Sequence, residues 1–455
     1  MTIKSIQLLS HASVIIKVDG LTILTDPWFF GTAFNDGWEL FPQPNLGTIP
    51  NDIKDVDLIW ISHEHPDHLH FPTLKYIKDL VPDHVQIGFQ STNSTKVFDA
   101  LKKLGYVNFL EMPHMERLKI NSDVELAIYA HRHLDCCLAV FIQNEFWLLN
   151  VNDTELNEND TRVIRQVWGC ADVLLNQFSI AGSQGIPNLL KSESQEILTK
   201  MCAVHDQLGA EITIPIASFM RFSCHDNFLL NSFANNPLDV SIEFSKKELN
   251  LALLSIQGEA LEWQGEEILP ANIDTVTSNS REKFLALYTH PLEINKDFNL
   301  GTIPAADVTR TLVNRISQLN RTTTFLLWNT MEPIVFKIPD WDSECWELDF
   351  KRLSFTKKSN DIDYDMKINS QPLEYTFKMP FGVQTLGVSG RYEFHTRHLN
   401  VPKTWKLLRI ITSLDNASIN ISFKGLFSRT LLKWVWLRRK GLLPQITQQI
   451  SRFFK

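Results

Sequence analysis

The run His63-Glu64-His65-Pro66-Asp67-His68 constrains this chain more than any other feature. Imidazole and carboxylate side chains are ligands for zinc, iron and manganese. The run directly follows the apolar stretch 58–61, which is typical of a buried strand. Closely spaced side chains in a turn at a strand end can converge on one metal ion. A continuous strand instead sends alternate side chains to opposite faces of the sheet. We therefore interpret the run as a metal-binding motif rather than a solvent-exposed turn rich in histidine.

The residues before this motif predict a group of short strands. Asp19-Gly20 is a typical hairpin turn between two apolar stretches. His11 follows the first predicted strand, and Thr25-Asp26-Pro27-Trp28 follows the third. The strands are predicted over residues 6–9, 14–18 and 21–24.

Strands followed by a His-x-His-x-Asp-His pattern resemble the metallo-β-lactamase superfamily. The chain is more closely similar to the metal-binding domain of the CMP-N-acetylneuraminic acid hydroxylase family, over about residues 5–235. The stretches that carry this resemblance are Asp26-Pro27-Trp28, Gly31-Thr32-Ala33-Phe34, Gly37-Trp38 and Phe71-Pro72-Thr73-Leu74-Lys75. The resemblance implies an α/β fold, namely an αββα metallo-β-lactamase sandwich. The histidine before Ala12 and the pattern Thr25-Asp26-Pro27 are also similar to two hydrolase branches, ascorbate-6-phosphate lactonases and a phospholipase D that acts on N-acyl-phosphatidylethanolamine.

The resemblance implies a binuclear metal centre with ligands at strand ends. His131 follows a predicted strand over residues 124–130 and is the implied third histidine. His133 competes with it, because alternation puts both on one strand face. Asp153 follows a predicted strand over residues 146–152 and is the implied bridging aspartate. His225, in the loop after a predicted strand over residues 212–216, is the implied last ligand. One metal is then bound by His63, His65 and His131, and the second by Asp67, His68 and His225, with Asp153 between them.

Other residues near the motif are candidates for catalysis or substrate contact. We expect Asp67, Asp153 and His11 to form the catalytic group. His11 is either a substrate contact, a partner of a carboxylate such as Asp26, or a core histidine. Loops over a scaffold carry specificity, so the candidates for substrate contact are the loop residues Asn35, Asp36, Trp38 and Arg221.

The metal is not decided by ligand type, since imidazole with carboxylate suits zinc, iron and manganese alike. We expect two metal ions per chain and favour iron, which suits a non-haem di-iron oxygenase that resembles the hydroxylase. The hydroxylase family also carries a Rieske iron–sulfur domain, which needs a Cys-x-His pair. No such pair occurs in these 455 residues, so we expect an oxygenase here to use an external ferredoxin or reductase, or a substrate that supplies electrons.

A metal-dependent hydrolase of a phosphodiester or lactone is the alternative enzyme. There, a metal-activated hydroxide attacks the substrate and Asp153 orients it. A non-catalytic binding module is a third hypothesis, and the complete set of candidate ligands argues against it. In each enzyme hypothesis the partner is a small-molecule substrate.

Composition limits the compartment and the partners. The formal charge of −8 argues against a nucleic-acid partner. No stretch reaches the ~18 apolar residues that span a bilayer, and the N-terminus does not read as a signal peptide. Six cysteines in so long a chain do not make a disulfide framework. We therefore expect a cytoplasmic protein.

Length favours two domains, a metal domain over residues 1–260 and an α+β domain over residues 270–455. Val308 to Leu319 reads as an amphipathic helix. Strands are predicted over residues 323–328, 334–338, 345–350, 364–368, 374–379 and 385–389. After Asp415 the charged residues are all basic and alternate with aromatic ones. This tail predicts either peripheral membrane contact or a helix that packs on its own domain.

Overall fold

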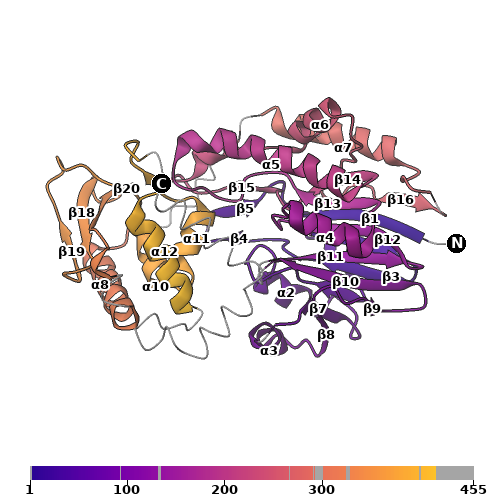
Figure 1. Ribbon diagram of the computed structural model, residues 1–455, viewed down its shortest axis with the longest axis horizontal. Coiled ribbons are helices and arrows are strands. Elements are labelled where there is room, and N and C mark those ends of the chain that lie inside the picture. The colour runs from indigo at the N-terminus through magenta and orange to yellow at the C-terminus, as the bar shows by residue number, and fades with distance from the viewer. Residues whose placement is uncertain are drawn as a thin grey trace.

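The structure is a computed structural model that describes residues 3–92, 94–131, 135–265, 267–290, 292, 301–323, 328–398 and 401–416. Two sheets pack face to face in its N-terminal part (Figure 1). The first has the order β16 (Leu261–Gln264), β1 (Ile3–Ser10), β2 (Ser13–Val18), β3 (Leu21–Thr25), β6 (Leu58–Trp60), β7 (Gln86–Gln90), β8 (Asn108–Met112). The second has the order β14 (Ile212–Ile216), β13 (Val173–Gln177), β12 (Glu145–Asn152), β11 (Asp135–Ile142), β10 (Val124–His131), β9 (Leu118–Lys119).

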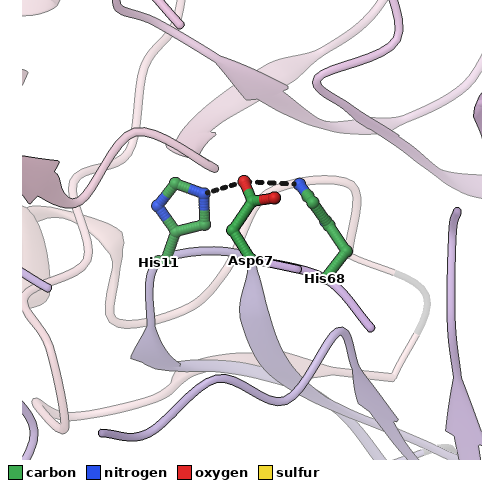
Figure 2. A group of neighbouring side chains, drawn as sticks. All are labelled: His11, Asp67 and His68. Atoms are coloured by element: carbon green, nitrogen blue, oxygen red, sulfur yellow. Dashed lines mark ion pairs between the residues drawn. The ribbon is translucent and has the colours of Figure 1, made fainter. Parts of the chain in front are cut away.

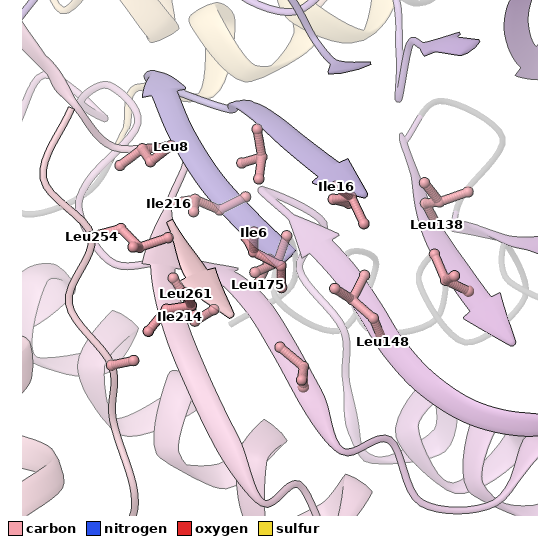
Figure 3. Close-up of a cluster of buried hydrophobic side chains, with 14 of the residues drawn as sticks. Ile6, Leu8, Ile16, Leu138, Leu148, Leu175, Ile214, Ile216, Leu254 and Leu261 are labelled. Carbon is pink, nitrogen blue, oxygen red and sulfur yellow. The ribbon is translucent and has the colours of Figure 1, made fainter. Parts of the chain in front are cut away.

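Side chains along each strand alternate between the two faces of its sheet, and both faces are buried. In β11, Leu138 and Val140 point into the core between the sheets, whereas Cys137 and Ala139 point to the outer face. The core between the sheets gathers residues from both sheets (Figure 3). Because both faces of each sheet are covered, the sequences of the strands are nearly continuous runs of apolar residues.

Helices cover both outer faces, so the predicted αββα sandwich is confirmed. The first sheet is covered by α1 (Ile49–Ile53), α2 (Phe71–Ile77) and α3 (Lys96–Lys103). The second is covered by α4 (Glu158–Trp168) and α5 (Pro187–Leu208). Further helical segments are η1 (Phe228–Ser232), α6 (Pro237–Lys246) and α7 (Ile273–Tyr288).

The sequence predicts a helix over residues 192–209, with a capping box formed by Ser192 and Gln195 and an end at Gly209. Helix α5 differs from this prediction at its start. A capping box was expected at Ser192, but the helix begins at Pro187, and the Ser192 hydroxyl donates to the carbonyl of Leu189 inside the helix. Proline at the first helical position explains the earlier start, because its fixed φ fits there. The predicted end at Gly209 is confirmed, with that residue in the left-handed conformation (φ 63°) that glycine adopts readily.

The C-terminal part builds a second core around a smaller sheet. That sheet has the order β19 (Ser354–Lys357), β18 (Glu344–Asp349), β17 (Ile334–Ile338), β20 (Met366–Lys367), β21 (Glu393–Phe394). It packs with α8 (Ala305–Thr322), α10 (Ser370–Lys378), α11 (Gly382–Ser389) and α12 (Lys403–Asn416). A three-stranded sheet of β15 (Met220–Phe222), β5 (Trp38–Leu40) and β4 (Thr32–Ala33) lies between this part and the sandwich (Figure 1).

Two predicted strands of the C-terminal part are wrong. Residues 374–379 and 385–389 lie in helices α10 and α11. Their buried residues recur at helical spacing, as Leu373, Thr376 and Phe377 show. The predicted strand over residues 323–328 falls mostly outside the described residues.

The predicted domain boundaries, 1–260 and 270–455, stay a prediction. Helix α7 packs Val276 and Phe284 into the core between the sheets of the sandwich. Among the described residues, no helix is both long and apolar enough to cross a bilayer. The basic, aromatic tail after residue 416 lies outside the described residues.

Leu138 lies in the core between the sheets and is fully buried. We expect Leu138→Ala to lower the free energy of unfolding by about 2–5 kcal/mol, because the truncation leaves a cavity. Val107→Ala is the control, since Val107 is 75% exposed, and should change stability by less than about 0.5 kcal/mol. Urea unfolding measures both variants. Equal effects would contradict the placement of Leu138 in the core.

Candidate metal centre

The histidine-rich motif lies in a turn directly after β6. That strand is parallel to β3, and the backbone N–H of Asp26, just past β3, donates to the carbonyl of Trp60 at 2.9 Å. The turn closes through the N–H groups of His68 and Leu69, which both donate to the carbonyl of His65 at 3.0 and 2.8 Å. The ends of two neighbouring strands therefore present their side chains at one edge of the sandwich.

Figure 2 shows the first cluster of candidate ligands, formed by His11, Asp67 and His68. Oδ2 of Asp67 lies 3.4 Å from Nε2 of His11 and 3.2 Å from Nε2 of His68. All three side chains are buried. One carboxylate oxygen therefore lies between two imidazole nitrogens that come from distant parts of the sequence.

Asp153, which follows β12, joins this cluster to the rest of the motif. Its Oδ2 lies 3.5 Å from Nε2 of His63 and 3.5 Å from Nε2 of His68. His63, His68 and Asp153 thus form a second cluster, in which all ligand atoms lie within 4.8 Å of one another.

A third cluster contains His63, His65 and Asp135. Nε2 of His63 lies 2.8 Å from Nδ1 of His65, so one ring nitrogen of each histidine faces the other. Asp135 begins β11 and pairs with His131 across the hairpin to β10. Asp135 is not among the ligands predicted from the sequence; the signal that could have found it is its position at a strand end beside His131.

Asp26 orients the central histidine of the site. Its carboxylate accepts the backbone N–H of Ser62 at 2.8 Å and the side-chain amide of Asn152, and it lies 3.2 Å from Nδ1 of His68. A proton on Nδ1 of His68 then faces Asp26, which leaves Nε2 directed at Asp67 and Asp153. This second carboxylate–imidazole contact is typical of histidines that ligate metals.

Charge and burial shift the pKa values of these groups in opposite directions. Burial lowers the pKa of His63, which therefore favours the neutral form that ligates metals. Burial also disfavours charge on Asp67 and His68, but their mutual attraction holds the pKa of Asp67 well below and that of His68 well above the usual value. Burial, with Asp153 next, raises the pKa of Asp135 to about 6. The site is therefore an electrostatically coupled set of acids and imidazoles.

The donor set fits a metal with nitrogen and oxygen ligands. Oδ1 of Asp67, Oδ1 of Asp153 and Nδ1 of His11 are buried and have no hydrogen-bond partner among the described residues. Buried polar atoms normally have partners, so such a group requires an explanation, and a cation supplies one. The nearby thiol of Cys136 donates to the carbonyl of Ser62 at 2.9 Å, and burial raises its pKa well above the usual value. Cys136 is thus a protonated core residue.

The remaining predicted ligands are placed differently. His131 is buried, with Nδ1 3.2 Å from Asp160 and Nε2 without a partner in the described part of the chain. None of the three clusters includes it. His133 lies outside the described residues, so the choice between the two histidines stays open. His225 is exposed and belongs to none of the clusters found among the described residues, so its role stays a prediction.

His11 is paired with Asp67 and not with Asp26, the carboxylate suggested for it. Two of the predicted substrate contacts, Trp38 and Arg221, form hydrogen bonds with other residues of the protein. The indole N–H of Trp38 donates to the carbonyl of Val388 at 3.0 Å, and Nε of Arg221 donates to the carboxylate of Glu39 at 2.5 Å. Their roles as substrate contacts stay predictions.

Comparison with known proteins finds relatives of the N-terminal part. The curated cytidine monophosphate-N-acetylneuraminic acid hydroxylase of Asterias rubens is 32% identical over 184 residues, covering 39% of this chain and 26% of the relative. That of Danio rerio is 27% identical over 231 residues, covering 46% of this chain and 37% of the relative. The chain therefore spans well under half the length of either relative.

Solved structures similar to this chain have low sequence identity. Igni18, described as a novel metallo hydrolase from Ignicoccus hospitalis, is 16% identical with a TM-score of 0.43, covering 58% of this chain and 100% of that one. CmlA, described as a diiron beta-hydroxylase from Streptomyces venezuelae, is 13% identical with a TM-score of 0.40, covering 58% of this chain and 54% of that one. Residues 5–157 match the family described as the beta-lactamase superfamily domain. Residues 5–157 are thus the part of the chain that is similar to the beta-lactamase superfamily domain.

Proposed function

We propose that this chain is a binuclear metal-dependent oxygenase that acts on a small-molecule substrate. The observation that carries the proposal is the position of Asp153, whose Oδ2 lies 3.5 Å from both His63 and His68. A carboxylate placed between two sets of imidazole and carboxylate ligands is suited to bridge two metals. The name of the curated relatives, a hydroxylase, favours oxygenation over hydrolysis.

The residues divide into two sets around Asp153. We assign His63 and His65, with Asp135 beside them, to one metal, and Asp67 and His68 to the other. Two non-haem irons bound there would supply the chemistry that activates dioxygen. His131 and His225 remain the proposed additional ligands of the first and second metal. Zinc and manganese are the other metals that this donor set accepts.

Protein groups around the ligands would orient the site and exclude water. Asp26 holds the Nδ1 proton of His68, which fixes the direction of its Nε2. The ring of Trp28 lies 5.4 Å from that of His11, and the ring of Phe34 lies 5.8 Å from that of His65. Such an apolar wall strengthens electrostatic interactions inside the site. We assign His11, whose Nε2 pairs with Asp67, to substrate contact.

An oxygenase also needs electrons. We propose that a separate ferredoxin or reductase supplies them, because these 455 residues contain no Cys-x-His pair. The second candidate function is hydrolysis of a phosphodiester or lactone, which the pairing of His11 with Asp67 and the nitrogen and oxygen donors also suit. There, Asp153 would orient the attacking hydroxide.

We expect His65→Ala to lose roughly one of two bound metal equivalents, because it removes a ligand from one set only. The control is His84→Ala, which removes an exposed histidine that lies outside the motif and pairs with Asp57. Metal content by elemental analysis, with circular dichroism to verify folding, measures both variants. A folded His65→Ala protein with full metal content would overturn the assignment of His65.

Metal identity separates the two candidate reactions. We expect protein purified without oxygen to hold about two irons per chain and to change its optical spectrum when oxygen is admitted. Zinc in both positions, an unchanged spectrum and turnover of a phosphodiester or lactone would instead establish the hydrolase.

A further inference from the structure

Three consecutive residues beside the metal centre have an unusual backbone conformation. Phe34, Asn35 and Asp36 have φ angles of 52°, 57° and 57°. A left-handed conformation is uncommon for residues with a side chain and disfavoured for bulky ones such as Phe34. Such a turn persists only where the surrounding structure holds it, and such turns cluster at functional sites. We call residues 34–37 the left-handed turn.

The left-handed turn builds the aromatic wall of the metal centre. The ring of Phe34 lies 5.8 Å from the ring of His65 and 4.7 Å from that of Trp38. The ring of Trp38 in turn lies 6.3 Å from that of His11. Phe34 and Trp38 are both buried. A change in the turn would therefore move side chains that touch two candidate site histidines.

Arg391, from the C-terminal part of the chain, holds this turn. Its side chain is 4% exposed. Nη1 donates to the carbonyl of Asn35 at 3.0 Å and to Oε1 of Gln371 at 2.7 Å. Gln371 and Asn35 also exchange two side-chain amide hydrogen bonds, at 3.2 and 2.9 Å. The guanidinium therefore fixes the turn directly and through a second side chain.

The same guanidinium fixes the loop that carries His225. Nε and Nη2 of Arg391 donate to Oδ1 and Oδ2 of Asp226 at 3.0 and 3.1 Å, a bidentate pair. The next residue, Asn227, donates to the carbonyls of Gly37 and Ser389 at 2.8 and 2.7 Å. A Cβ on Gly37 would lie 2.6 Å from that of Ser389, so only glycine fits there.

We infer that Arg391 is a positioning residue for the metal centre: it locks the left-handed turn, and so Phe34 against His65, from a part of the chain outside residues 5–157. The interaction with the turn stands on the described contacts alone. Its consequence for metal binding rests on the proposed function. Lysine would not replace Arg391, because it cannot form the bidentate pair with Asp226 while reaching Asn35 and Gln371.

The first test is hydrogen exchange of the metal-free full chain. In Arg391→Met, backbone amides of residues 32–38 should exchange at least about tenfold faster, since losing one partner of a buried ion pair costs more than one decade in an equilibrium constant. Arg397→Met is the matched control, because Arg397 is part-exposed and pairs with Asp363 and Asp365. Gln371→Ala removes the contacts of Gln371 with Asn35 and Arg391 but keeps the Arg391–Asp226 pair, and it covers the case in which Arg391→Met does not fold. Unchanged exchange in the turn would overturn the inference.

The second test separates positioning from general stabilisation. The rate at which a chelator removes cobalt(II), together with its visible absorption spectrum, is measured for Arg391→Met, Phe34→Leu and the double variant. We expect Arg391→Met to release cobalt roughly tenfold faster, as for other residues that support metal ligands without touching the metal. If Arg391 acts through Phe34, the double variant should release cobalt no faster than the faster single variant. Additive effects would overturn the inference, whereas failure of the wild-type protein to bind cobalt would count against the proposed function alone.

Discussion

The buried carboxylate of Asp26 is the interaction on which the rest of the site depends. It is completely buried, and it contacts the turn after β6 through Ser62, the end of β12 through Asn152, and the imidazole of His68. A buried charge is tolerated only where it is paired and hydrogen-bonded. One carboxylate therefore ties together both sheets of the sandwich and sets the direction of His68, which belongs to two of the three clusters of candidate ligands.

That arrangement explains why part of the site could be predicted from sequence. The ligands in the motif are neighbours along the chain, and Asp153 follows a strand whose apolar run is plain. The strands themselves were predictable because alternating or continuous apolar runs report burial. The contacts of Asp26 with Ser62 and Asn152 could not be predicted, since these partners lie 36 and 126 residues away in the sequence.

The rest depended on tertiary contacts. Asp135 lies far from the motif in the sequence, and its place at the site follows from the register of the β10–β11 hairpin, which sets it beside His131. The structure has helices α10 and α11 where strands are predicted, since short apolar segments fit both periods. Arg391 could not have been selected at all: its partners Asn35 and Asp226 are 356 and 165 residues away. A surface arginine and a buried one look the same in sequence.

Both parts of the chain thus contribute to the proposed site. The sandwich supplies candidate ligands at its strand ends, and the C-terminal part holds the loops that border them. X-ray absorption at the metal edge of the metal-loaded protein is the most direct test of a binuclear site with nitrogen and oxygen ligands only. We expect a coordination sphere without sulfur and a second metal at roughly 3.5–4 Å. A sulfur ligand, or a single metal without a metal neighbour, would contradict the proposed site.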